Sequence, residues 1–180
     1  FDPVFEVSGD SLVTEKGKYS TTVIKDDAIN WLKNRKDTDK PFMLMYQFKA
    51  PHRPWDPGPG YEDYLKDVTI PHPATFNDDY KGRKAAKAAW MKIDGHMNRK
   101  DVKIKAPKGL TEEELIAWNK FGNNDGEFWT PDSEMTKQER KNWKYQRYIK
   151  DYLRVVKGVD DAIGEMLNHL DESGLAENTI

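Results

Sequence analysis

The sequence predicts an α/β fold, because one strand-like apolar run is accompanied by two segments with helical periodicity. Residues 41–48 (PFMLMYQF) are almost continuously apolar over the length of a strand. A strand that is apolar on both faces is typical of a parallel sheet covered by helices. A buried helical segment is the alternative, although the run is short for a helix. Residues 20–35 and a longer segment ending near Glu172 both place apolar side chains at helical spacing. We therefore expect a central, mostly parallel sheet flanked by helices.

The chain opens with a predicted β-hairpin and a predicted helix. Residues 4–7 and 12–14 carry strand-forming side chains and flank the turn sequence Ser8-Gly9-Asp10-Ser11. The helix predicted for residues 20–35 has basic side chains in its last turn, which suits the partial negative charge of a helix C-terminus. Its apolar face consists of Ile24, Ala28, Trp31 and Leu32.

The segment after the predicted strand is rich in turn formers. Residues 49–60 (KAPHRPWDPGPG) contain four prolines and two glycines and are predicted to form a loop. Residues 61–67 are predicted to form a short helical turn. Residues 68–77 are expected to be extended, since Pro71 and Pro73 bias the residues before them away from the helical conformation.

Further helices are predicted in the rest of the chain. Residues 78–93, rich in Ala and Lys, are predicted to form one helix. Thr136 and Glu139 have the spacing of a capping box, and we expect a long helix from there to about Glu172, ended by Ser173-Gly174. The same capping-box spacing, at Thr111 and Glu114, precedes a shorter apolar segment, and residues 123–133 are predicted to form a polar loop.

Composition and charge exclude several classes of function. The formal net charge is -2, so no basic field indicates nucleic-acid binding. The sequence contains no cysteine, which excludes disulfides, thiolate metal sites and a cysteine nucleophile within this chain. No apolar run approaches the ~20 residues of a membrane span, and no signal peptide is visible. We interpret both ends as cut points of a longer protein.

The candidate chemistry lies in residues 49–55 (KAPHRPW), which directly follow the predicted strand. Ligands of open α/β sheets bind outside the carboxyl ends of the strands. His52 is suited to protonate a leaving oxygen or to hold an anion. Lys49 adds a compact positive charge, and Arg53 adds a planar fork for an oxyanion. From the spacing alone, a proline-rich surface loop with incidental basic residues is the alternative.

Four segments of the chain resemble the sulfatase family of the alkaline phosphatase-like superfamily. Residues 41–55 resemble the family's apolar strand and the loop with its His-x-Pro motif, here His52-Arg53-Pro54. Residues 70–83 resemble its proline-rich segment, and residues 148–180 resemble the long helix before its metal-binding strand. Residues 19–32 fit the helix before the His-x-Pro strand. The sequence Lys-Ala-Pro-His with an aromatic residue soon after resembles the branch that acts on sulfated sugars of glycosaminoglycans and mucins.

The resemblance implies a fragment of an alkaline phosphatase-like domain from a sulfuric ester hydrolase that acts on a sulfated glycan or small molecule. In that family a hydrated formylglycine attacks sulfur and forms a sulfated intermediate, and the enzymes of this type depend on calcium. By the resemblance, His52 is catalytic and contacts the sulfate or the leaving oxygen, while Lys49 and Arg53 bind substrate. It also implies a periplasmic or secreted location.

The chain departs from the family pattern in ways that define its expected role. The signature Cys-or-Ser-x-Pro-x-Arg, whose first residue becomes formylglycine, has no counterpart here. The family's metal ligands would lie on either side of the chain. We therefore expect an internal part of one catalytic domain, residues 1–180, that contains no metal or cofactor site and is inactive without the remainder of the domain. Residues 95–142 match nothing in the family and are interpreted as a branch-specific insertion.

Other functions remain open from the sequence. One is a phosphodiesterase or phosphonate hydrolase of the same superfamily, which would differ in its nucleophile. Another is a non-enzymatic carbohydrate-binding module. The Asp-Asp pairs, such as Asp160-Asp161, are interpreted as solvated or helix-capping, and His72 as packed or exposed. The binding module would use aromatic residues for which core packing is the alternative: Trp118, Phe121, Phe128, Trp129 and Trp143.

Overall fold

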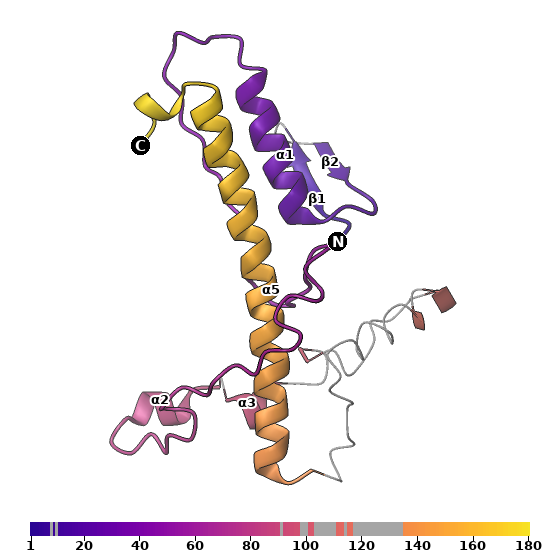
Figure 1. The fold of residues 1–180 in the computed structure, drawn as a ribbon, viewed down its shortest axis with the longest axis vertical. Helices are drawn as coiled ribbons and strands as arrows, with labels where there is room; N and C mark the ends of the chain where they lie inside the picture. The colour runs from indigo at the N-terminus through magenta and orange to yellow at the C-terminus, as the bar shows by residue number, and fades with distance from the viewer. Residues whose placement is uncertain are drawn as a thin grey trace. The chain divides into compact units, whose positions relative to one another are not determined.

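The structure, a computed structural model, describes residues 1–7, 9, 11–90, 92–97, 101–102, 111–113, 115–116 and 135–180. The chain forms two compact units. The first unit comprises Phe1–Tyr61 with Arg154–Ile180, and the second unit comprises Glu62–Leu153. The elements in Figure 1 are β1 (Val4–Val7), β2 (Ser11–Thr14), α1 (Ser20–Lys33), α2 (Lys84–Ala88), α3 (Ile93–His96), α5 (Lys137–Glu172) and the 3-10 helix η1 (Ala176–Asn178).

The first unit begins with the predicted β-hairpin. Strands β1 and β2 pair antiparallel, with Val4 opposite Thr14 and Val7 opposite Ser11. Gly9 in the connection has a φ of 92°, a left-handed conformation that glycine adopts without steric cost. The hairpin prediction is therefore confirmed.

Helix α1 runs alongside the C-terminal half of α5 in the first unit, as Figure 1 shows. The buried core contains Ala28 and Leu32 of α1 and Met166 of α5. Lys25 Nζ also pairs with Glu165 at 2.6 Å, but an ion pair at the surface contributes only about 0–1 kcal/mol. Burial of Ala28 and Leu32, rather than ion pairing, therefore holds the two helices together. The predicted apolar face is confirmed for these two residues, whereas Trp31 is 45% exposed.

Residues 41–48 do not form the predicted strand buried on both faces. In the described part of the chain, no segment pairs with them through backbone hydrogen bonds. Phe42 and Leu44 pack against the core, whereas Met43 and Met45 are 82% and 67% exposed. The physical reason is that an extended segment without neighbouring strands has only one packed face. Among the described residues the only sheet is the two-stranded hairpin, so the predicted parallel sheet is not formed there.

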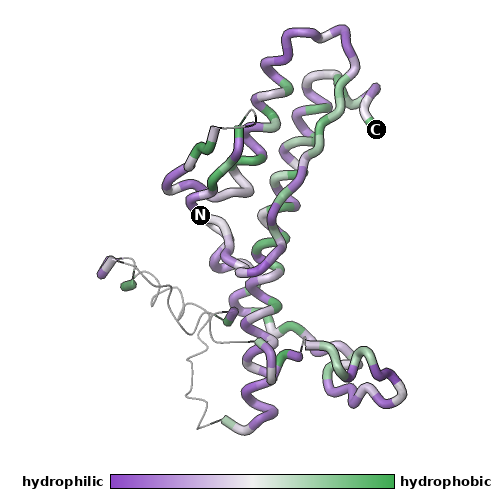
Figure 2. Tube along the Cα trace, turned by 180° about the vertical axis from the view of Figure 1, so that it is seen from behind, coloured by the Kyte–Doolittle hydropathy of each residue, from purple (hydrophilic) through white to green (hydrophobic). Residues whose placement is uncertain are grey.

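The inner face of residues 41–48 is fixed against both helices of the first unit. Figure 2 shows the segment running along α5. The rings of Phe42 and Trp31 meet edge to face with their centroids 5.7 Å apart. The Tyr46 hydroxyl donates a hydrogen bond to the Ala162 carbonyl oxygen at 3.1 Å, and burial raises the pKa of Tyr46 to about 12. These contacts fix the point at which the chain enters the loop at residue 49.

Helix α5 ends at the predicted glycine stop. Gly174 has a φ of 70°, and the Leu175 N–H donates to the Leu170 carbonyl oxygen at 2.9 Å. A left-handed glycine followed by this backward hydrogen bond satisfies carbonyl groups that a helix end leaves unpaired. Leu170 and Leu175 also pack against the core of the first unit.

The second unit contains the N-terminal half of α5, which begins at the predicted capping box. The Thr136 N–H donates to Glu139 Oε2 at 2.8 Å, and the Glu139 N–H donates to Thr136 Oγ1 at 3.2 Å. Hydrogen bonds from Thr136 lower the pKa of the Glu139 carboxyl. Because this reciprocal pairing satisfies N–H groups that a helix start leaves free, it confirms the predicted start of the long helix.

In the second unit, α5 also holds the segment that precedes α2. The side-chain amide of Gln146 pairs with both backbone groups of Ile70, at 3.0 Å and 2.8 Å. Residues 68–73 form no helix or strand, and residues 74–77 form turns. The His72 ring stacks on Phe76 with the ring centroids 4.0 Å apart. His72 is therefore packed against an aromatic neighbour, as expected.

The helix predicted for residues 78–93 is wrong in length, because among the described residues of this range only α2 (Lys84–Ala88) and the start of α3 are helical. Asp78 Oδ1 accepts the Tyr80 N–H at 2.8 Å, a bond that competes with helical hydrogen bonding. Tyr80 and Gly82 have φ values of 56° and 77°, which a right-handed helix cannot contain. The prediction weighed Ala and Lys propensity and overlooked the turn-forming aspartate.

None of the helices that the structure describes is both long and apolar enough to cross a membrane.

Several predicted features fall outside the described residues. Trp143 on α5 is described and is partly buried. The features that lie outside are Glu114 of the first capping box, the loop at residues 123–133, Trp118, Phe121, Phe128 and Trp129.

Candidate functional site

The three candidate side chains lie together at the start of a loop. The His52 N–H donates to the Lys49 carbonyl oxygen at 3.0 Å, which closes a turn over residues 49–52. Arg53 follows this turn directly. The side chains of Lys49, His52 and Arg53 are all exposed. The structure therefore presents the imidazole and both cations on one short, solvent-accessible segment.

The imidazole of His52 has a defined orientation. Its Nδ1 lies 2.6 Å from the Arg53 carbonyl oxygen. A carbonyl oxygen can only accept a hydrogen bond, so Nδ1 carries the hydrogen and donates it. Nε2 is therefore the ring nitrogen that gains or loses a proton. In this orientation Nε2 can protonate a ligand oxygen, or the imidazolium can hold an anion.

The turn that carries His52 is supported by Trp55. The Trp55 indole N–H donates to the Pro51 carbonyl oxygen at 3.0 Å. The peptide bonds that precede Pro51 and Pro54 are both cis. Trp55 is half-buried, in contrast to the exposed His52. The indole thus fixes the carbonyl group of Pro51, the residue directly before His52.

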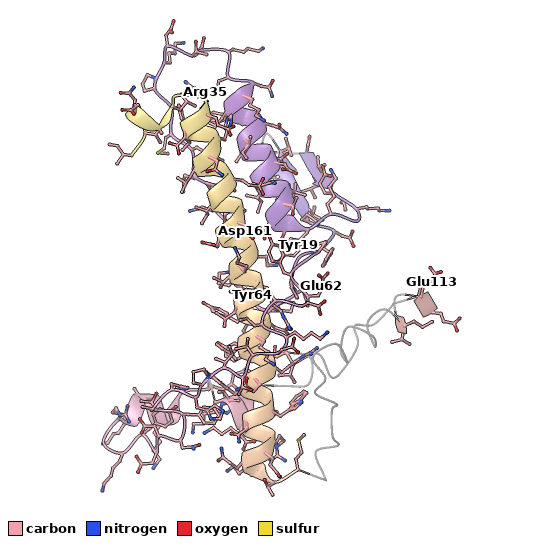
Figure 3. The ribbon with its side chains drawn as sticks, in the orientation of Figure 1. Tyr19, Arg35, Glu62, Tyr64, Glu113 and Asp161 are labelled. Carbon is pink, nitrogen blue, oxygen red and sulfur yellow. The ribbon has the colours of Figure 1, made fainter. Side chains whose placement is uncertain are left out.

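The far part of the loop is anchored beside the start of α1. The Tyr19 hydroxyl donates to the Asp56 carbonyl oxygen at 3.0 Å, and burial raises the pKa of Tyr19. Pro57 and Gly58 are buried, and Figure 3 labels Tyr19. A Cβ at Gly58 would lie only 2.7 Å from Tyr19 Cε1. Sequence reasoning missed this anchor, whose only signal is an aromatic residue directly before a predicted helix.

A second tyrosine, Tyr61, anchors the chain directly after the loop. Its hydroxyl donates to Asp161 Oδ2 at 3.0 Å, and Lys157 Nζ pairs with Oδ1 of the same carboxylate. These donors, Lys157 first and Tyr61 second, lower the pKa of the Asp161 carboxyl. The position of a Cβ on Gly158 is 3.5 Å from the Tyr61 ring. Asp161, labelled on α5 in Figure 3, therefore holds Tyr61 in place.

The described residues form no calcium site, and the sequence contains no formylglycine motif. Within the described ranges, no group of three or more His, Asp or Glu side chains is placed to hold a metal ion. The sequence has no cysteine, and none of its serines has proline two residues later. Neither calcium nor formylglycine is therefore given a role in the catalytic steps assigned to residues of this chain.

The elements around this loop have a counterpart in a known family. The sequence matches the family described as Sulfatase over residues 3–180. The chain belongs to the sulfatase family. The resemblance found in the sequence is confirmed, and an alkaline phosphatase-like fold follows from membership of this family.

Two curated relatives are similar to this sulfatase chain. An N-acetylglucosamine-6-O-sulfatase of Bacteroides thetaiotaomicron is 38% identical over 201 residues, which cover 100% of this chain and 35% of the relative. An arylsulfatase of Clostridium perfringens is 37% identical over 59 residues, which cover 33% of this chain and 12% of the relative.

A solved structure is similar to the sulfatase chain in fold as well as in sequence. It was determined for a protein in complex with its substrate, D-glucosamine-2-N,6-O-disulfate. The two are 36% identical with a TM-score of 0.78, over 97% of this chain and 38% of the solved chain. The sulfatase chain therefore spans little more than a third of the length of the relatives that it matches in full.

Proposed function

We propose that the protein carrying this chain hydrolyses sulfuric esters of a carbohydrate, and that the chain forms one side of the substrate site. The observation that carries the proposal is the exposed His52 imidazole, whose Nε2 is left available by the bond from Nδ1 to the Arg53 carbonyl oxygen. The similarity to proteins named for sulfated glucosamines supports a sulfated glucosamine unit as the substrate.

We assign His52 to the leaving oxygen. Cleavage of a sulfate ester breaks the bond between sulfur and the ester oxygen, and the departing oxygen of a sugar needs a proton. Protonated His52 supplies this proton from Nε2, while Nδ1 remains bonded to the Arg53 carbonyl oxygen. General acid catalysis of this kind contributes about 10²–10⁴-fold to the rate.

We assign Lys49 and Arg53 to the sulfate group. Both are exposed on the segment that carries His52, so they can approach the same ligand. Lys49 offers a point charge, and Arg53 offers paired donors that match two oxygens of a tetrahedral anion. Contacts that are equally strong in the ground state and the transition state lower KM without raising kcat.

The remaining chemistry is assigned to parts of the protein outside this chain. The sequence has no formylglycine motif, and the residues that the structure describes form no calcium site. We therefore propose that residues 1–180 are an internal part of one catalytic domain, with residues 95–142 as a branch-specific insertion. The chain by itself should not hydrolyse an aryl sulfate, with or without added calcium, and turnover above buffer would contradict the assigned roles.

The proposed function is tested by the leaving-group dependence of His52→Ala in the full-length protein. An acidic phenol departs without protonation, whereas a sugar alcohol does not. We expect kcat for glucosamine 6-sulfate to fall by about 10²–10⁴-fold, and kcat for a nitrophenyl sulfate to fall far less. Equal losses on both substrates would reject the acid role and leave sulfate binding. No loss on either substrate, in a correctly folded protein, would remove His52 from the mechanism.

A further inference from the structure

A surface pocket of about 590 Å³ lies in the second unit, lined by α3, the start of α5, Lys87 of α2 and the turns that precede α2. Sites for small ligands typically have volumes of about 300–1,000 Å³. The pocket is therefore large enough for a sugar unit. Its lining is unusual in charge, because four lysines and three aspartates face the same space.

The carboxylates at this pocket are engaged by other groups. Asp78 is ion-paired with Arg83, and this contact lowers the pKa of the Asp78 carboxyl. Asp94 pairs with Arg140 at 3.3 Å. Asp94 also pairs with the lining residue Lys137 at 3.9 Å, so the charge of Lys137 is partly offset. Asp79 Oδ1 accepts a backbone N–H at 2.8 Å, an uncharged donor that leaves its negative charge in the lining.

The lining remains positive, because Lys87, Lys92 and Lys141 together outweigh the carboxylate of Asp79. In the part of the chain that the structure describes, the ammonium groups of Lys87 and Lys92 make no ion pair. Lys141 Nζ donates to the Phe76 carbonyl oxygen at 2.5 Å and to Asn77 Oδ1 at 2.9 Å. Both acceptors are uncharged, so the charge of Lys141 remains unbalanced. An anion entering this space would meet several cations at once.

Aromatic side chains give the same pocket an apolar character. The backbone N–H of Lys92 donates to His96 Nδ1 at 3.1 Å, so a neutral His96 carries its hydrogen on Nε2 and can donate it. The Trp90 ring, 70% exposed, lies 5.1 Å from the His96 ring. Phe76 and Tyr145, with ring centroids 5.1 Å apart, belong to the lining itself, whereas Trp90 lies outside it.

We propose that this pocket binds an anionic sugar unit of a glycan. The uncompensated lysines favour an anion, and the exposed Trp90 ring beside the lining residue His96 favours the apolar C–H face of a sugar. A free inorganic anion would use only the cations, and a neutral sugar would use only the aromatic surface. A sugar that bears a sulfate or a carboxylate satisfies both features. The class of ligand rests on the proposed function. The pocket would be a second binding site for the same glycan, made of residues outside the loop at 49–55.

The site is tested by lysine footprinting of the full-length protein, with brief acetylation followed by mass spectrometry. Glucosamine 6-sulfate is the probe, and glucuronate, unsulfated glucosamine and inorganic sulfate are compared at equal ionic strength. We expect the probe to slow acetylation of Lys87 and Lys92, and to leave Lys81 and Lys84, which lie outside the lining, unchanged. Protection by glucuronate as well would identify a site for any acidic sugar, and protection by the sulfated sugar alone would identify a sulfate-specific site.

Two double variants with the same charge loss sharpen the test. Lys87→Gln with Lys92→Gln should weaken binding of glucosamine 6-sulfate at this pocket by about tenfold, as expected for the loss of a charge-assisted contact. Lys81→Gln with Lys84→Gln is the matched control and should change it less than about twofold, since exposed distant charges are screened. Equal losses in the two variants, uniform protection of all four lysines, or inorganic sulfate binding as tightly as the sulfated sugar would each overturn the proposal.

Failure of this site is distinguishable from failure of the proposed function. Lys49 reports on the loop in the same footprinting experiment, whereas Lys87 and Lys92 report on the pocket. Protection of Lys49 without protection of the pocket lysines rejects the pocket and leaves the loop assignment intact. Protection of the pocket lysines without Lys49 supports the pocket and counts against the loop.

Discussion

The Tyr19 hydroxyl donates a hydrogen bond to the Asp56 carbonyl oxygen across 3.0 Å. This bond connects the residue before α1 with the loop that carries His52. Gly58 lies against the same buried ring. The loop therefore depends on side chains that make no contact with substrate in the proposed mechanism, and substitutions there should affect both stability and turnover.

Gly58→Ala should destabilise the protein by about 1–3 kcal/mol, the usual cost of overpacking. The added Cβ would lie 2.7 Å from Tyr19 Cε1 and 2.8 Å from Cδ1. Tyr19 is buried and hydrogen-bonded, so its ring cannot move away freely. Urea unfolding of the full-length protein measures the change.

Gly164→Ala is the matched control for this substitution. Gly164 lies inside α5, and a Cβ there would meet nothing within 4 Å. Alanine is favoured over glycine inside a helix by about 0.5–1 kcal/mol, so this variant should be slightly more stable. If both variants change stability in the same direction, the contact between Gly58 and Tyr19 is not the cause.

Asp161→Asn should reduce the dependence of stability on acid pH. Hydrogen bonds from Lys157 and Tyr61 lower the folded-state pKa of the Asp161 carboxyl. A lowered pKa means that the ionised form stabilises the fold above the unfolded-state pKa of about 3.9, and that this contribution is lost as pH falls through the folded-state pKa. Melting temperatures of the two proteins should therefore differ most above about pH 5 and converge as the pH falls through the lowered folded-state pKa of Asp161.

Asp160→Asn removes the same formal charge beside Asp161 and controls for general charge effects. Asp160 lies 3.5 Å from Lys157 Nζ and is largely exposed. Tyr61→Phe separately removes the hydroxyl donor and should lower stability by about 1 kcal/mol at neutral pH. A melting profile of Asp161→Asn that runs parallel to wild type at every pH would contradict the assigned role of Asp161.

Thr136→Ala should lower the free energy of unfolding by about 1 kcal/mol, because it removes the hydroxyl that accepts the Glu139 N–H. Amide hydrogen exchange should rise in the first turn of α5. Thr22→Ala, an exposed position inside α1, makes the same chemical change away from a cap and should be neutral or slightly stabilising. Equal destabilisation by both variants would show that the cap is not responsible.

Lys49→Gln in the full-length protein should raise KM for glucosamine 6-sulfate by roughly tenfold and alter kcat little, since it removes a charged contact to the bound anion. Lys36→Gln, an exposed position in the same unit, is the control and should leave both parameters unchanged. Steady-state kinetics on the two variants decide the question. A fall in kcat with unchanged KM would place Lys49 in the chemical step instead.

Local signals in the sequence were sufficient for much of the fold. The capping box at Thr136 and Glu139, the glycine stop at Gly174 and the turn in the hairpin each depend on a few neighbouring residues. The apolar spacing of α1 predicted the helix and the burial of Ala28 and Leu32, but not the exposure of Trp31. In all these cases the physical cause lies within one or two turns of chain.

Features that depend on distant partners were predicted less well. Residues 41–48 have the composition of a buried strand, but whether Met43 is covered depends on neighbouring strands that the described residues do not provide. The loop was placed correctly after this segment, yet its anchors at Tyr19 and Tyr61 form across the chain and leave no periodic signal. The pocket of the second unit was not predicted for the same reason, since Lys87 and Lys141 come together only in the folded chain.

The division of α5 between the two compact units has a consequence for synthesis on the ribosome. The apolar face of α1 is covered by residues near Glu165, which is 140 positions after Lys25 in the sequence. At about 5–20 residues per second, translation of that interval takes on the order of ten seconds. During this time the second unit can complete its internal contacts, and Phe42 and Leu44 can already pack against Ala28 and Leu32, but Met166 of α5 is still missing from this core. The rate of translation through residues 62–153 therefore sets how long the nascent chain holds the core of the first unit incomplete.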